Sequence, residues 1–163
     1  MRKTVLAIVA LASICFVSVV HALDEQNPSA KVGSPAPDFS LQDQNGNTVS
    51  LADLKGKIVV LEWVNPNCPF VVRHYQAKTF PTLAEKYAQN DVVWLAINTT
   101  TGSTADDNKA WVEKHGLKYP ILDDSAGNVG RAYGAKTTPH MFIINKDGVL
   151  VYAAASIMIL MAT

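Results

Sequence analysis

Cys68 is the residue with the clearest potential for chemistry. The apolar run at 58–61 before it is typical of a buried strand, and Pro69 after it suits the first turn of a helix, where its missing N–H would have no partner. This pattern places Cys68 between a strand and a helix N-terminus. Unpaired N–H groups and the helix dipole there favour the thiolate, which is the nucleophilic form of cysteine. We therefore predict a redox-active cysteine at position 68.

The first residues of the chain have the features of a targeting segment. Two basic residues precede an uncharged apolar run over residues 4–20, and Val20-His21-Ala22 is a small-x-small cleavage pattern. We predict a signal peptide over residues 1–22 and a periplasmic or secreted protein. An uncleaved membrane helix stays open as an alternative, since about 18 apolar residues suffice to span a bilayer.

The two cysteines of the chain have different expected fates. Signal cleavage would remove Cys15 and leave Cys68 alone in a compartment that oxidises thiols into pairs. Cys68 could then form no internal disulfide. One alternative is lipoprotein modification at Cys15, but Ile14 occupies the position before it, where lipoproteins have a small residue. The other alternative is a purely structural role for Cys68 as a small buried hydrophobic residue.

Composition limits the class of protein and its partners. The 163 residues, 48% of them hydrophobic, fit one globular domain, and the formal net charge of zero provides no basic surface, so we expect no nucleic-acid partner. We expect membrane contact only through the signal segment before cleavage. The predicted organisation is a signal peptide (1–22), a flexible lead-in (23–31), one domain (32–155) and an atypical apolar tail (156–163).

Predicted strands and helices alternate along the domain, which indicates an α/β fold with a central mixed sheet flanked by helices. Pro81 interrupts the helix that follows Cys68, so we expect one helix to about residue 75 and a second over 80–89. The other predicted elements are an N-terminal hairpin around Asn45-Gly46, a helical turn over 51–54 capped by Ser50, strands at 57–63, 92–97 and 119–122, helices from 103 to 115 and from 124 or 125 to 133, and a hairpin at 141–144 and 149–152.

The order of several segments resembles the redoxin branch of the thioredoxin superfamily, which includes alkyl hydroperoxide reductase and thiol-specific antioxidant proteins. The resemblance covers about residues 31–153 and implies a thioredoxin-like fold with an N-terminal β-hairpin extension. Such relatives continue into a C-terminal helix, whereas residues 153–163 are uncharged here, so we expect that helix to be missing or altered. The matching segments are 33–41, 43–46, 51–60, Cys68-Pro69-Phe70 and 138–143.

The resemblance implies that Pro139 is a cis-proline that faces Cys68. The backbone of Thr138 would then be turned toward the sulfur and offer hydrogen-bonding groups to an extended substrate segment. A trans proline that opens a strand is the alternative. His140 follows directly and is either a proton donor or a packing residue.

The chain departs from its relatives at four positions. Val71 stands where thioredoxins have a second cysteine, so Cys68 would depend on an external thiol for turnover. Leu61 and Asn65 occupy the proline and threonine positions of the peroxiredoxin signature, which argues against efficient peroxidase chemistry. Val72 stands where copper-carrying relatives have a cysteine, and we expect no metal and no cofactor.

Three further residues are candidates for a supporting role. Arg73 could steady a sulfur anion or bind an acidic substrate, or simply lie on a solvated helix face. Glu62 could point inward and accept a proton with a raised pKa, or point toward the rim as an ordinary charge. Trp63 could form a wall of the site or pack in the core.

The predicted function is that of an exported thiol oxidoreductase in which Cys68 is the nucleophile. It would reduce a hydroperoxide through a sulfenic acid, or form a mixed disulfide with a disulfide substrate, with an antioxidant or redox-homeostasis role. An external thiol reductant or a thioredoxin-like donor would recycle it. The alternatives are a non-enzymatic binding module that uses the groove beside Pro139, and a truncated remnant with little activity.

Overall fold

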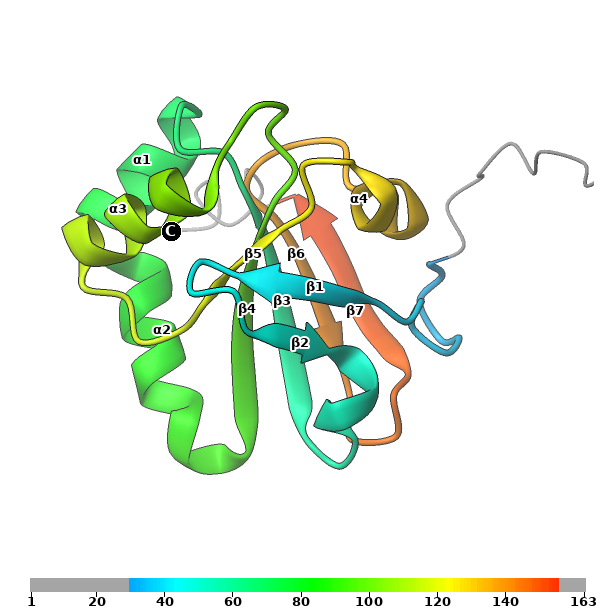
Figure 1. Ribbon diagram of the computed structural model, residues 1–163. Helices are drawn as coiled ribbons and strands as arrows, with labels where there is room; N and C mark the ends of the chain where they lie inside the picture. Colours follow the sequence, from blue (N-terminus) through cyan, green and yellow to red (C-terminus); the bar gives the residue numbers. More distant parts are fainter. Residues whose placement is uncertain (1–29, 156–163) are drawn as a thin grey trace, which may run out of the picture.

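The computed structural model describes residues 30–155, which form a central sheet with helices on both faces (Figure 1). The predicted signal peptide, most of the predicted lead-in and the apolar tail at 156–163 lie outside the described residues. The part of the chain that the structure describes contains no helix that is both long enough and apolar enough to cross a membrane.

The sheet has seven strands in the order β2-β1-β5-β4-β3-β6-β7. Strands β3, β4 and β5 are parallel to one another, whereas β6 runs antiparallel to β3, so the sheet is mixed as predicted. The hairpin β1–β2 extends the sheet beyond β5, which is the predicted N-terminal extension. The strands are β1 (Ser40–Asp43), β2 (Thr48–Ser50), β3 (Ile58–Val64), β4 (Val92–Asn98), β5 (Ile121–Asp123), β6 (His140–Ile144) and β7 (Leu150–Ala155).

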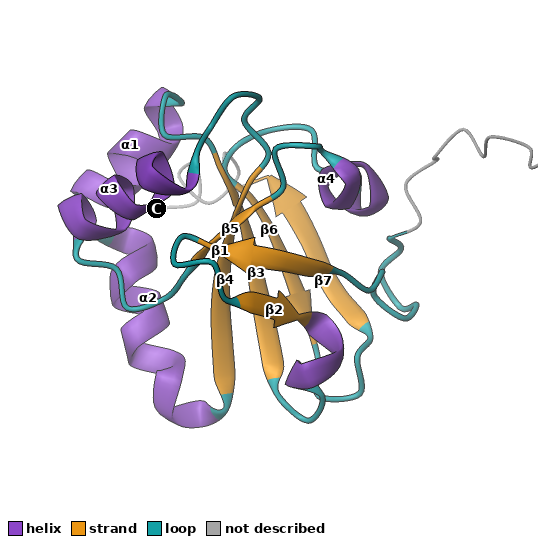
Figure 2. Cartoon of the chain, in the orientation of Figure 1, coloured by secondary structure: helices purple, strands orange, loops and turns teal. Residues whose placement is uncertain are grey.

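Helices cover the two faces of the sheet unequally (Figure 2). Helices α1 (Pro69–Gln76), α2 (Thr79–Tyr87) and α3 (Ala105–His115) lie on one face, and α4 (Asn128–Tyr133) lies on the other. Each helix contributes to the buried cluster on its own side, so the core has two halves separated by the sheet. Two short 3₁₀ helices, η1 (Leu51–Leu54) and η2 (Ala88–Asn90), complete the described elements.

The central strand β3 is buried on both faces, and its side chains alternate between the two halves of the core. Val60 and Val64 belong to the cluster beneath α1, α2 and α3, whereas Leu61 and Trp63 belong to the cluster beneath α4. Because Glu62 lies between Val60 and Val64 in this alternation, it faces the side of α1.

Several predicted boundaries were wrong by a few residues. The helix after Cys68 ends at Gln76, and Lys78 then adopts a left-handed conformation before α2 begins at Thr79. Pro81 therefore lies in the first turn of α2, where its ring clashes with no preceding turn of helix. Ser50 occupies the N-cap position of η1, but its side chain makes no capping hydrogen bond.

Two other helix starts differ from the prediction. Helix α3 begins at Ala105 and not at 103, and Thr104 caps it through a capping box with Asp107. Helix α4 begins only at Asn128, but the predicted cap Asp124 still accepts hydrogen bonds from the N–H groups of Val129 and Gly130. The sequence predicts a helix from position 124 or 125, but Asp124 satisfies the N–H groups of α4 from outside the helix, across the turn at 125–127.

Candidate active site

Cys68 lies at the N-cap of α1, between the end of β3 and the first helical turn. Its backbone is extended, with φ −79° and ψ 122°, and Pro69 follows at the first helical position. The side chain is half-buried and packs against the core cluster beneath α1. Within residues 30–155 it is the only cysteine.

The loop before β6 brings Thr138 and Pro139 to this sulfur. Strand β6 pairs antiparallel with β3, with His140 opposite Trp63, so the loop before β6 lies at the end of β3 from which the Cys68 turn departs. The Thr138–Pro139 peptide bond is cis, in agreement with the sequence-based expectation. The Cys68 Sγ atom lies 3.1 Å from the Thr138 carbonyl oxygen, a distance at which a thiol donates a hydrogen bond.

The surroundings of Cys68 lower the pKa of its thiol. Partial burial acts in the opposite direction and raises the pKa. The Thr138 side chain and the N–H groups of Val71 and Phe70 outweigh burial, because they stabilise the negative sulfur at the start of the helix. The site therefore favours the thiolate more than an ordinary cysteine environment does.

Glu62 is another ionisable group on this side of the sheet, and its side chain is fully buried. Its Oε2 atom accepts a hydrogen bond from Trp94 Nε1 at 2.8 Å, whereas Oε1 has no hydrogen-bond partner. Burial raises the pKa of Glu62 from 4.5 to about 7, and interactions with Trp94, Tyr75 and Tyr119 oppose this rise. Of the two orientations left open by the sequence, the structure thus has the inward one.

Glu62 belongs to a buried polar cluster that also contains Tyr75 from α1 and Tyr119 from the segment before β5. The two tyrosine hydroxyls are 3.3 Å apart, with Tyr119 donating to Tyr75. Burial is the main cause that raises the pKa of both tyrosines, and the negative charge of Glu62 raises the pKa further. The cluster therefore connects the helix that carries Cys68 with a carboxyl group that can exchange a proton near neutral pH.

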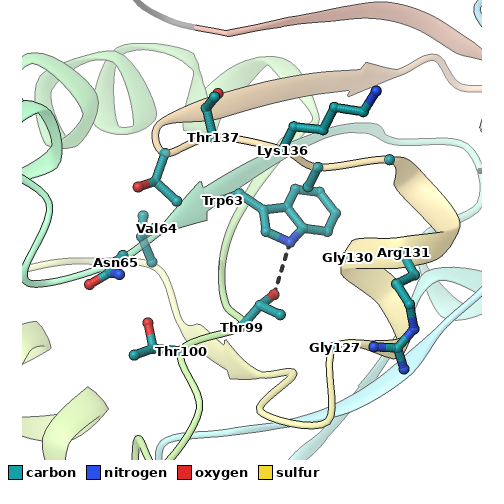
Figure 3. A pocket seen from close by; sticks show the side chains of 13 residues that line it. Trp63, Val64, Asn65, Thr99, Thr100, Gly127, Gly130, Arg131, Lys136 and Thr137 are labelled. Carbon is teal, nitrogen blue, oxygen red and sulfur yellow. Dashed lines mark hydrogen bonds between the residues drawn. The ribbon is translucent and has the colours of Figure 1, made fainter.

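Trp63 forms part of a pocket of about 520 Å³ on the other side of the β3 end (Figure 3). We call this the Trp63 pocket. Trp63 is only 2% exposed and packs against Tyr133 and Phe142, so it is at once a core residue and a wall. Its Nε1 atom donates to Thr99 Oγ1 at 3.1 Å. The remaining residues that line the pocket are Val64, Asn65, Thr99, Thr100, Gly127, Gly130, Arg131 and residues 134–138.

The other predicted candidates, Arg73 and His140, contact aromatic rings. Arg73 is exposed, and its guanidinium lies 5.7 Å from the centre of the Phe70 ring. His140 stacks on Phe142 at 4.4 Å, and burial lowers its pKa. Within the described part of the chain, no group of three or more histidine, cysteine or acidic residues is arranged to hold a metal.

Sequence reasoning missed the residues that the fold brings together from distant segments. Thr99 is one of them: its hydroxyl accepts from Trp63 and donates to Asp124 Oδ2 at 3.0 Å. Tyr75 and Tyr119 are separated by 44 residues, and nothing in their local pattern indicates a shared carboxyl group. Only the strand order could have predicted these neighbours.

Comparison with known proteins gives consistent relatives. Residues 32–153 match the model of the AhpC/TSA family. The thiol-disulfide oxidoreductase ResA of Geobacillus thermodenitrificans is 32% identical over 148 residues, which cover 90% of this chain and 81% of that protein. These relatives agree with the resemblance inferred from the sequence.

Solved structures support the fold. A hypothetical protein of Sinorhizobium meliloti has a TM-score of 0.70 at 31% identity, over 77% of this chain and 70% of that chain. A thiol:disulfide interchange protein DsbE of Chlorobium tepidum has a TM-score of 0.66 at 25% identity, over 78% of this chain and 86% of that chain. The predicted thioredoxin-like fold is thereby confirmed.

Proposed function

The chain belongs to the AhpC/TSA family, and on this basis we propose that it is an exported thiol-disulfide oxidoreductase with Cys68 as its sole nucleophile. The Cys68 thiolate attacks one sulfur of a substrate disulfide. A bond forms between Sγ and that sulfur, the substrate S–S bond breaks, and the other substrate sulfur leaves as a thiolate. A second, external thiol then attacks the mixed disulfide and releases Cys68.

One observation carries this proposal: the sulfur is half-buried at the N-cap of α1, beside the Thr138 carbonyl. Helix N–H groups stabilise the attacking thiolate, and they would equally favour Cys68 as the leaving thiolate in the second step. The adjacent Thr138 and Pro139 backbone is positioned to align an extended substrate segment beside the sulfur.

We assign supporting roles to Glu62 and Trp63. Glu62, with a pKa of about 7, accepts the proton of an incoming thiol through the buried cluster that reaches α1. Trp63 shapes the pocket next to Thr138. Arg73 contributes only long-range positive charge at the exposed surface of α1, because its guanidinium lies over Phe70.

Reduction of a hydroperoxide by the same sulfur is the weaker candidate. The Asn65 side chain stands where a peroxiredoxin has its threonine, and its Oδ1 atom accepts from the Asn67 N–H at 2.8 Å. That oxygen is therefore used as an acceptor within the loop, and Asn65 lacks the hydroxyl group of the threonine that it replaces. A sulfenate-reactive probe applied after brief peroxide treatment tests this reaction. Efficient labelling of Cys68 would support hydroperoxide reduction as a function of the protein.

The proposed function is tested by trapping the mixed disulfide. The purified protein is incubated with a disulfide-containing peptide at pH 6.5, and the adduct is located by mass spectrometry. We expect the adduct on Cys68 and none in Cys68→Ser. A matched control is the double variant Cys68→Ser/Ala77→Cys, which places a single thiol on the exposed end of the same helix.

The two single-thiol proteins should differ in rate. Each unit by which a thiol pKa falls gives about tenfold more thiolate but about threefold lower nucleophilicity, so the net gain is about threefold per unit. Because the pKa of Cys68 is lowered, it should react faster than the cysteine at position 77. Equal rates would contradict the proposal. If, in addition, Cys68→Ser still binds the substrate, the result would favour the alternative of a binding module.

A further inference from the structure

The charges around the Trp63 pocket are all of one sign. The charged residues that line it are Arg131 and Lys136, and among the described residues none of those that line it is acidic. Both residues are exposed, and the Arg131 guanidinium already donates hydrogen bonds to the Ala126 carbonyl oxygen and to Asn128 Oδ1. Within residues 30–155 the one ion pair is Lys146–Asp91, so no neighbouring carboxylate neutralises either of the two rim cations.

The nearest buried carboxylate is already used by the protein. Asp124 is 2% exposed, lies behind Thr99, and accepts hydrogen bonds from the Thr99 hydroxyl and from the N–H groups of Val129 and Gly130. It is therefore held by fixed donors and is directed into α4, and not toward the pocket opening. The pocket thus combines an aromatic wall with an excess of positive charge at its rim.

The pocket also has two distinct ends. In Figure 3, Asn65 and Thr100 lie on one side of the Trp63 ring, and Arg131 lies on the other, with Lys136 above the ring. Asn65 belongs to the turn of Cys68, because the Cys68 N–H donates to the Asn65 carbonyl at 2.9 Å. One end therefore adjoins the turn that carries the reactive sulfur, Lys136 lies above the ring, and Arg131 lies at the opposite end.

We propose that the Trp63 pocket binds a small thiol or disulfide that carries a carboxylate, with its sulfur toward Cys68 and its carboxylate toward Lys136. This inference rests on the proposed function and names the chemical class of its exchange partner. A pocket of about 520 Å³ is large enough for a molecule of that kind.

The test compares two disulfide reagents that both react with thiolates but differ in charge. Dithiobis(nitrobenzoate) carries a carboxylate on each ring, and dithiodipyridine is neutral. In each case the Cys68 thiolate forms a disulfide with one half of the reagent and displaces the other half as a coloured thiol. A peptide with the sequence of residues 65–70, which has no charged side chain, gives the intrinsic ratio of the two rates.

We expect the anionic-to-neutral rate ratio of the protein to exceed that of the peptide several-fold. Lys136→Gln should lower the ratio by about threefold, the factor for one unit charge about 6 Å away in water. Lys109→Gln, at an exposed lysine of α3 outside the pocket, should leave the ratio unchanged. In the unmodified protein the ratio should also fall toward the peptide value as salt rises to 1 M, where screening acts over about 3 Å.

The outcomes separate this inference from the proposed function. If Cys68 reacts faster than the peptide with both reagents but the ratio equals that of the peptide, the carboxylate preference is wrong and the redox function stands. An equal effect of Lys136→Gln and Lys109→Gln would also overturn the preference. If neither reagent reacts faster with the protein than with the peptide, the proposed function itself fails.

Discussion

Replacing the buried carboxylic acid by its amide, Glu62→Gln, tests the electrostatics of the cluster beneath α1. Glutamine has nearly the shape of a protonated glutamic acid, and its oxygen can still accept from Trp94 Nε1. The variant therefore keeps the neutral state at every pH. The wild-type protein must instead hold a charged carboxylate in the core once the pH exceeds the pKa of about 7.

The size of the effect follows from the change in pKa between the unfolded and folded states. Because the folded pKa of this acid is raised, the folded protein binds one more proton than the unfolded chain between pH 4.5 and about 7. Its contribution to stability is complete below pH 4.5 and falls as the pH rises through that window. With about 1.4 kcal/mol per pKa unit, the total loss is about 3 kcal/mol.

The assay is urea unfolding of wild-type protein and Glu62→Gln from pH 5 to pH 8.5. The stability of the variant relative to wild type should rise by about 2.5 kcal/mol across this range, because part of the loss in wild type occurs below pH 5. Buried histidines act in the opposite direction, since burial lowers the pKa of His74, His115 and His140, but they are common to both proteins and cancel. Glu85→Gln, at an exposed glutamate of α2, serves as the control. A pH-independent difference between wild type and Glu62→Gln would refute the reasoning.

Three further predictions concern the sulfur and the wall of the Trp63 pocket. Alkylation of Cys68 should reach half of its maximal rate at a lower pH than alkylation of the peptide of residues 65–70, because the Thr138 side chain and the helix N–H groups favour the thiolate; a midpoint at or above that of the peptide would contradict this. Val71→Cys introduces a second thiol three residues after Cys68, so mild oxidation should yield an internal disulfide and the trapped mixed disulfide should fall at least tenfold, as measured by mass spectrometry; an undiminished adduct would show that the two positions cannot pair. Asp124→Ala removes the acceptor for two buried N–H groups and should lower the free energy of unfolding by about 3 kcal/mol in urea titrations, whereas the exposed Asp53→Ala should change it little; similar small effects of both substitutions would contradict the role assigned to Asp124.

Local pattern was sufficient to place the sulfur. A buried strand, a short loop of three residues, a cysteine and then a proline indicate that Cys68 is at a helix N-terminus, because proline is suited to the first turn of a helix. The cis bond before Pro139 was expected from the resemblance alone, since no local feature distinguishes it from a trans proline. The sheet order, which joins the two, is set by packing between distant segments.

Local pattern could not determine which way Glu62 points. Strand β3 is buried on both faces, so its residues lack the polar and apolar alternation that would identify a solvent side. The start of α4 was misplaced for a related reason, because Asp124 caps the helix from outside the first turn. The Trp63 pocket was unpredictable in detail, since its walls come from segments up to 75 residues apart, from Trp63 to Thr138.

The alternation along β3 has a consequence for how this protein can be altered. Glu62 and Trp63 are neighbours in the chain, yet one supplies the acid beneath α1 and the other the indole of the pocket on the opposite side. Inserting or deleting a single residue in the first half of the strand would exchange their sides and remove both the proposed proton acceptor and the proposed binding wall in one event. Engineering of either half must therefore keep the length of β3 and act by substitution alone.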